Sequence, residues 1–139
     1  KVELPDVAVL SLEAIPTDAA QDKPLADTSI DFSVLKKIAM SHAAQVEMLR
    51  EFNLHNRSDI ANLNAALKDG NPAAVARIAH RIKGSSRMVG ALDLDVICMA
   101  IEKAAAQGDM NGAQKIADTS LGAAIERIET VIGKFINGQ

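Results

Sequence analysis

The sequence predicts an all-α fold, an antiparallel up-down-up-down four-helix bundle with a short N-terminal helix covering one end. Hydrophobic residues form 48% of the 139 residues, which is enough for a core, and aromatic residues form only 2%. A core of aliphatic and small side chains favours packed helices over a sheet. From residue 31 onward the apolar side chains recur at helical spacing, and no stretch shows the alternation of a strand.

The N-terminal part of the chain differs in composition from the rest. Residues 1–28 hold three of the four prolines and six acidic residues against two lysines. Such a segment cannot bury much apolar surface, so we expect an acidic linker that is partly disordered. The bundle is expected over residues 29–139.

Capping residues and glycines divide the rest of the chain into helices. Asp31 is a suitable N-cap for a short helix over about 32–39, and Ser41 for a second helix that ends near Asp69-Gly70. Asn71-Pro72 starts a third helix, because Asn caps well and Pro is favoured at the first helical position. The short connections make successive helices antiparallel neighbours.

The same signals place the last two helices and the end of the third. The third helix is expected to run to about Val89 with Gly90 as its terminator, and a fourth covers about 92–107 and closes at Gly108. Asp109 caps a fifth helix that continues to about Ile136.

Composition and charge exclude several function classes. The net charge of −3 argues against nucleic-acid binding by bulk electrostatics, and the single cysteine excludes an internal disulfide. Cys98 lies in an apolar run, so we expect a buried, inert thiol. No apolar stretch approaches the ~20 residues that a membrane span needs.

One histidine has unusual neighbours, in the segment Ala79-His80-Arg81-Ile82-Lys83-Gly84-Ser85-Ser86. At about 100° per residue, His80 lies opposite the apolar stripe of its helix, on the solvent face. Its neighbours on that face are small or cationic: Ala73, Ala76, Arg77, Lys83, Gly84 and Arg87. A glycine inside a helix costs roughly 1 kcal/mol against alanine, which suggests that another molecule must come close to the ring.

This arrangement suits phosphoryl chemistry. An imidazole with its reference pKa near 6.5 is largely an uncharged nucleophile at neutral pH. Lys83, one turn along, is placed to balance the charge of a phosphoryl group, and Gly84 gives clearance to a partner. We expect Ala73, Ala76, Arg77, Arg87 and Met88 to contact that partner, with the arginines forming a positive rim that guides an acidic surface.

The other histidines lack such neighbours. We expect surface or structural roles for His42 and His55, which lie 13 residues apart and point away from each other on one helix. A metal or haem site between the histidines is therefore not expected. The run of cations on the third helix has no aromatic stacking partners, which argues against nucleic acid.

The octapeptide around His80, followed by Gly90-Ala91, resembles the signature of histidine-containing phosphotransfer (HPt) domains. The resemblance extends over roughly residues 29–136. It implies that His80 is the phosphoacceptor, that Lys83 is the polar residue near the phosphate, and that Gly84 clears the docking site. It also implies phosphorelay: the histidine takes a phosphoryl group from an aspartate of one receiver domain and passes it to another.

The resemblance also carries expectations about context. It implies response-regulator receiver domains as partners, no kinase activity, no cofactor in this domain, and Mg²⁺ in the partner receiver. We expect the isolated domain to be monomeric, with no direct membrane contact. We expect it in the cytoplasm, as the C-terminal module of a hybrid sensor kinase and the cytoplasmic end of a membrane-anchored one. The alternative is a binding-only adaptor whose histidine is never phosphorylated.

Overall fold

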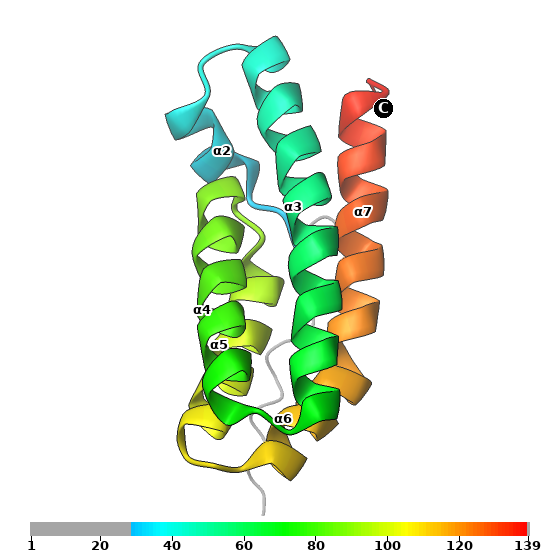
Figure 1. Cartoon of the computed structure of the whole chain (residues 1–139). Helices are drawn as coiled ribbons and strands as arrows, with labels where there is room; N and C mark the ends of the chain where they lie inside the picture. The colour runs from blue at the N-terminus through cyan, green and yellow to red at the C-terminus, as the bar shows by residue number, and fades with distance from the viewer. Residues whose placement is uncertain (1–28, 139) are drawn as a thin grey trace, which may run out of the picture.

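A computed structural model describes residues 29–138, and the linker expected over residues 1–28 lies outside this range. Every regular element in the described range is helical (Figure 1). The helices are α2 (Phe32–Ile38), α3 (His42–Asp69), α4 (Pro72–Val89), α5 (Leu92–Ala106), α6 (Met110–Ile116) and α7 (Gly122–Ile136). The all-α prediction is therefore confirmed.

The helix ends follow the capping chemistry of the sequence. The side chains of Asp31, Ser41 and Asn71 each accept a hydrogen bond from a backbone N–H in the first turn of α2, α3 and α4. Gly70 and Gly90 end α3 and α4 with φ of 67° and 78°, a left-handed conformation that favours glycine. The predicted starts and ends of these helices are confirmed to within a residue, and α5 ends one residue earlier than expected.

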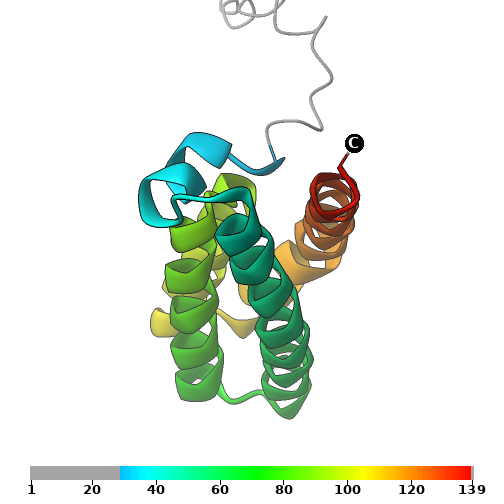
Figure 2. The ribbon, with the colours of Figure 1, turned by 90° about the horizontal axis from the view of Figure 1, so that it is seen from above.

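The helices α3, α4 and α5, together with the α6–α7 pair, form the bundle, and α2 covers one end. Seen from above, α2 lies across the end of α4 beside the start of α3 (Figure 2). The core consists of aliphatic side chains and alanines from every helix, among them Leu35, Leu49, Leu63, Val75, Ile82, Leu94, Ile101, Ile128 and Ile132. The predicted bundle with a covering helix is thus observed.

The last helix differs from the prediction. Instead of one uninterrupted α-helix after Asp109, a wide π turn at Ala117–Leu121 separates α6 from α7. Buried residues in this region follow one another at intervals of four: Ala113, Ala117 and Leu121. In an ordinary α-helix, residues four apart are offset by about 40° around the helix axis, so a series of them gradually leaves the buried side. A wider turn removes this offset and keeps the residues on the same side.

The small polar residues after His80 serve the packing of α4. Ser85 and Ser86 both donate to the carbonyl oxygen of Ile82, at 3.1 and 2.6 Å. Cys98 is fully buried in the core, and burial, with smaller contributions from Asp95 and Glu102, raises the pKa of its thiol to about 12. The expectation of a buried cysteine is confirmed. In the described range, no helix combines the length and apolar character of a membrane span.

Candidate functional site

His80 lies in the middle of α4, on the side away from the core. Its side chain is 68% exposed. The opposite side of α4 is buried and carries Val75, Ile78 and Ile82. Since α4 is fixed by this apolar face, the imidazole stands on a rigid support in contact with solvent, as the helical spacing predicts.

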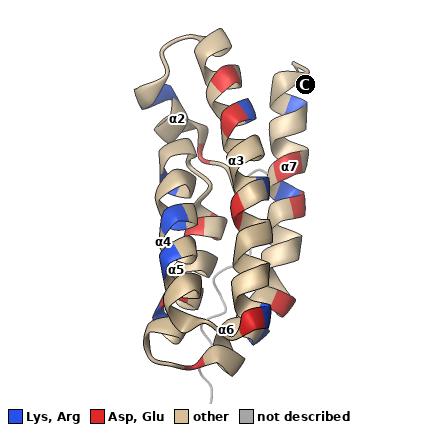
Figure 3. Cartoon of the chain, in the orientation of Figure 1, with Lys and Arg blue, Asp and Glu red and all other residues tan. Residues whose placement is uncertain are grey.

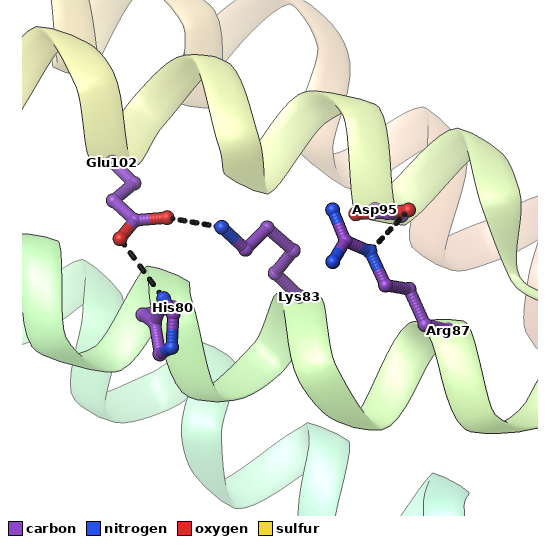
Figure 4. Close-up of polar contacts among 5 residues, drawn as sticks. All are labelled: His80, Lys83, Arg87, Asp95 and Glu102. Atoms are coloured by element: carbon purple, nitrogen blue, oxygen red, sulfur yellow. Dashed lines mark hydrogen bonds and ion pairs between the residues drawn. The ribbon is translucent and has the colours of Figure 1, made fainter.

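A carboxylate from the neighbouring helix contacts the ring. Glu102 on α5 places Oε2 3.0 Å from Nδ1 of His80 and Oε1 2.8 Å from Nζ of Lys83 (Figure 4). An ionised carboxylate only accepts hydrogen bonds, so Nδ1 must carry the proton in this contact. The other ring nitrogen, Nε2, then holds the lone pair, and in Figure 4 it faces away from Glu102.

The surroundings of Glu102 keep it ionised. The hydrogen bond from Lys83 lowers the pKa of this carboxyl most, burial opposes the shift, and the hydrogen bond from His80 adds to the lowering. The Glu102 side chain is 27% exposed and that of Lys83 only 15%. At neutral pH the three side chains therefore form a connected polar cluster at the seam between α4 and α5.

Three basic residues of α4, Arg81, Lys83 and Arg87, are paired with carboxylates of the neighbouring helices. Figure 3 shows Lys and Arg gathered along this helix. Besides Lys83, Arg87 binds Asp95 of α5 and Arg81 binds Asp59 of α3, each at 2.9 Å. Of the two arginines of the expected positive rim, Arg87 is thus balanced by a carboxylate of α5, and Arg77 makes no such contact with the described residues.

Gly84 has no packing reason for its missing side chain. A Cβ atom built on this glycine meets nothing within 4 Å, whereas one built on Gly90 runs into the backbone of Asp31. Gly84 lies one turn after His80 on the same face of α4. The structure therefore leaves open space on the surface beside the imidazole.

The residues expected at the docking surface all lie on the outer side of α4. Ala73, Arg77, Arg87 and Met88 are exposed and Ala76 is half-buried. Met88 also borders an open, mainly apolar groove between α3 and α4. The groove is lined by Met48, Glu51, Phe52, His55, Ser85, Met88 and Val89.

Two features of the site were not predicted from the sequence. The contact of Glu102 with His80 was not predicted, although Asp95 and Glu102 lie two helical turns apart on one side of α5 and so signal a polar seam. His55, assigned a surface or structural role, lines the groove from α3. Among the described residues, no cluster of three or more His, Cys, Asp or Glu side chains is arranged to hold a metal ion.

The model of the Hpt domain family matches residues 47–131, a span that contains both His80 and Glu102. Because the match covers more than half of the chain, the protein belongs to the Hpt family. Hpt domains carry phosphoryl groups in two-component phosphorelays; they are phosphocarriers rather than kinases, and they interact with response-regulator receiver domains. No curated protein sequence and no solved structure matches the chain significantly.

Proposed function

We propose that His80 accepts a phosphoryl group from the aspartyl phosphate of one receiver domain and passes it to the aspartate of another. The observation that carries this proposal is the contact between Glu102 and Nδ1 of His80. It leaves the lone pair of an exposed imidazole on Nε2, directed away from Glu102. A nucleophile that is accessible and already in the reactive tautomer requires no activation by a further base.

The transfer is a substitution at phosphorus. The Nε2 lone pair attacks the phosphorus in line, an N–P bond forms, and the bond between phosphorus and the aspartyl oxygen breaks to release the receiver's carboxylate. Onward transfer reverses these events on the second receiver. Positioning and charge stabilisation supply most of the rate acceleration in such a step.

Lys83 stabilises the charge of the transferred group. An ammonium group has three donor hydrogens, and Glu102 takes one of them at 2.8 Å. The remaining hydrogens are available to phosphoryl oxygens on Nε2, so Lys83 keeps its contact with Glu102 during the transfer. The domain itself contributes no cofactor to this step, and Mg²⁺ comes with the receiver.

The receiver docks over the exposed side of α4 and the groove between α3 and α4. Gly84 offers open space beside the imidazole, and the apolar side chain of Met88, 53% exposed, lies one turn further along. Arg77 and Arg87 border this surface and orient an acidic partner. The surface combines an apolar centre with a charged border, the usual composition of a transient interface.

The test is incubation with a phosphorylated receiver domain. We expect acid-labile, alkali-stable label on the wild-type chain and none on His80→Gln. The matched control is His42→Gln, which removes another exposed histidine, at the start of α3 and outside the groove, and should leave labelling in place.

Two outcomes contradict the proposal. Equal labelling of the wild type and His80→Gln places the phosphoryl group elsewhere. Binding of the phosphorylated receiver without any transfer of label assigns the chain to binding-only adaptors, the alternative function.

A further inference from the structure

We propose that Glu102 holds one proton on Nδ1 of His80 through both halves of the relay, so that His80 leaves the phosphoryl group as a neutral imidazole. This inference rests on the proposed function of His80. It assigns Glu102 a positioning role that goes beyond orienting the free ring. The role concerns the phosphorylated state and the rate of onward transfer.

The charged groups in the region of the ring come from α3, α4 and α5. Glu102 is the carboxylate in contact with His80 among the described residues, at 3.0 Å from Nδ1. The carboxylate of Asp59 on α3 is bound to Arg81 and is not shared with the ring. Arg77, Arg81 and Lys83 are the basic residues within one turn of His80 on α4, and Lys103 follows Glu102 in the sequence of α5.

The chemistry of phosphohistidine depends on that proton. When the Nε2 lone pair of a neutral ring forms the N–P bond, the proton stays on Nδ1 and the ring becomes a phosphoimidazolium cation. If the N–P bond then breaks, its electron pair returns to Nε2 and a neutral imidazole departs. Had the Nδ1 proton been lost first, the departing group would be an imidazolide anion, a much poorer leaving group.

Glu102 is suited to keep the proton in place. Its carboxylate stabilises the positive ring that phosphorylation creates, because opposite charges at hydrogen-bond distance favour the charged form. Lys83 binds the second oxygen of the same carboxylate at 2.8 Å and so fixes its orientation. With this arrangement, neither accepting nor donating the phosphoryl group requires a proton to move.

The pH profile of onward transfer tests this role. The wild type, Glu102→Ala and Glu102→Gln are phosphorylated with phosphoramidate, which avoids dependence on receiver docking. Each is then mixed with excess unphosphorylated receiver, and the loss of label from His80 is followed between about pH 6 and pH 9. Asp93→Asn is the matched control, since it removes another acid of α5 whose nearest basic group is Arg127 of α7, at 3.8 Å.

We expect a nearly flat profile for the wild type and for Asp93→Asn. For Glu102→Ala the rate should fall steeply with rising pH, roughly tenfold across the range, because the phosphorylated ring loses its proton. Glu102→Gln should lie in between, since its amide oxygen still accepts from Nδ1 without carrying charge. Nitrogen NMR of ¹⁵N-histidine in the phosphorylated proteins should show a protonated Nδ1 at pH 8 in the wild type but not in Glu102→Ala.

The outcomes separate this inference from the function on which it rests. Label on His80 with the same flat profile in the wild type and Glu102→Ala overturns the role of Glu102 and leaves the phosphoacceptor in place. Absence of label on wild-type His80 overturns both. A uniform loss of rate at every pH in Glu102→Ala, without a change of profile, indicates an effect on packing alone and also contradicts the inference.

Discussion

Glycine is present inside α4, at Gly84, and directly after it, at Gly90, for different reasons. Gly90 ends the helix with a φ of 78°, and its carbonyl oxygen accepts a 2.7 Å hydrogen bond from the backbone N–H of Asp31. Gly84 lies within the regular helix and has open space where a side chain would be. The packing of the fold requires Gly90 and not Gly84, which agrees with the proposal that Gly84 gives clearance to a partner.

Substitution of Gly90 should have the largest effect on stability. In Gly90→Ala the added Cβ meets the backbone of Asp31 and the residue keeps a left-handed φ, so we expect a loss of about 3 kcal/mol in the free energy of unfolding. Denaturant unfolding measures this loss. Wild-type stability in this variant would show that α2 adjusts freely, and the contrast with Gly84 would disappear.

Substitution of Gly84 should have the opposite pattern. Gly84→Leu should not destabilise the fold, because nothing within 4 Å opposes the new Cβ and leucine has a better helix propensity than glycine. Transfer from a phosphorylated receiver should slow by roughly 100-fold, because a displaced partner loses the in-line geometry. Rapid-mixing kinetics of label transfer measure the rate.

Gly84→Ala is the matched control for Gly84→Leu. Alanine should raise stability by about 0.5–1 kcal/mol through its helix propensity, with a smaller loss of transfer rate. Normal transfer by Gly84→Leu would remove the clearance argument.

A smaller effect on the stability of the fold at acid pH is expected from Asp31, the residue whose backbone contacts Gly90. Hydrogen bonds from the Oγ and backbone N–H of Ser33 lower the pKa of Asp31 below its ordinary 3.8. A carboxyl with a lowered pKa stabilises the fold above its ordinary value, and this contribution is lost as the pH falls through the lowered value.

The comparison of wild type with Asp31→Asn isolates this charge, since Asn is also a good N-cap. We expect the difference in melting temperature between the two to shrink as the pH falls from 7 to about 3. A difference that stays constant over this range would exclude the charge of Asp31 as its cause.

Local signals in the sequence were sufficient for much of this fold. Caps such as Ser41 and Asn71 determine where helices begin, and the apolar stripe of α4 determines which side His80 occupies. Both depend on residues a few positions apart. The exposure of the ring and the small residues Ala76 and Gly84 beside it could therefore be predicted from the chain alone.

Contacts between helices were harder to predict. Helical spacing shows that Glu102 lies on one side of α5, but its distance from His80 depends on how α4 and α5 align, which no local pattern fixes. The same reason explains why the ion pairs of Arg81 and Arg87 were not predicted: their partners Asp59 and Asp95 come from other helices. The phosphoacceptor assignment itself remains a prediction.

The π turn between α6 and α7 has a consequence for how sequences of this kind vary. Its five residues, Ala117–Leu121, hold one more residue than an ordinary turn needs, and they bring the buried side of α7, with Ile128 and Ile132, into register with that of α6. Loss of one residue here would let the turn relax to an ordinary α-helical turn. A single-residue length difference at this point is thus absorbed locally, far along the chain from the histidine.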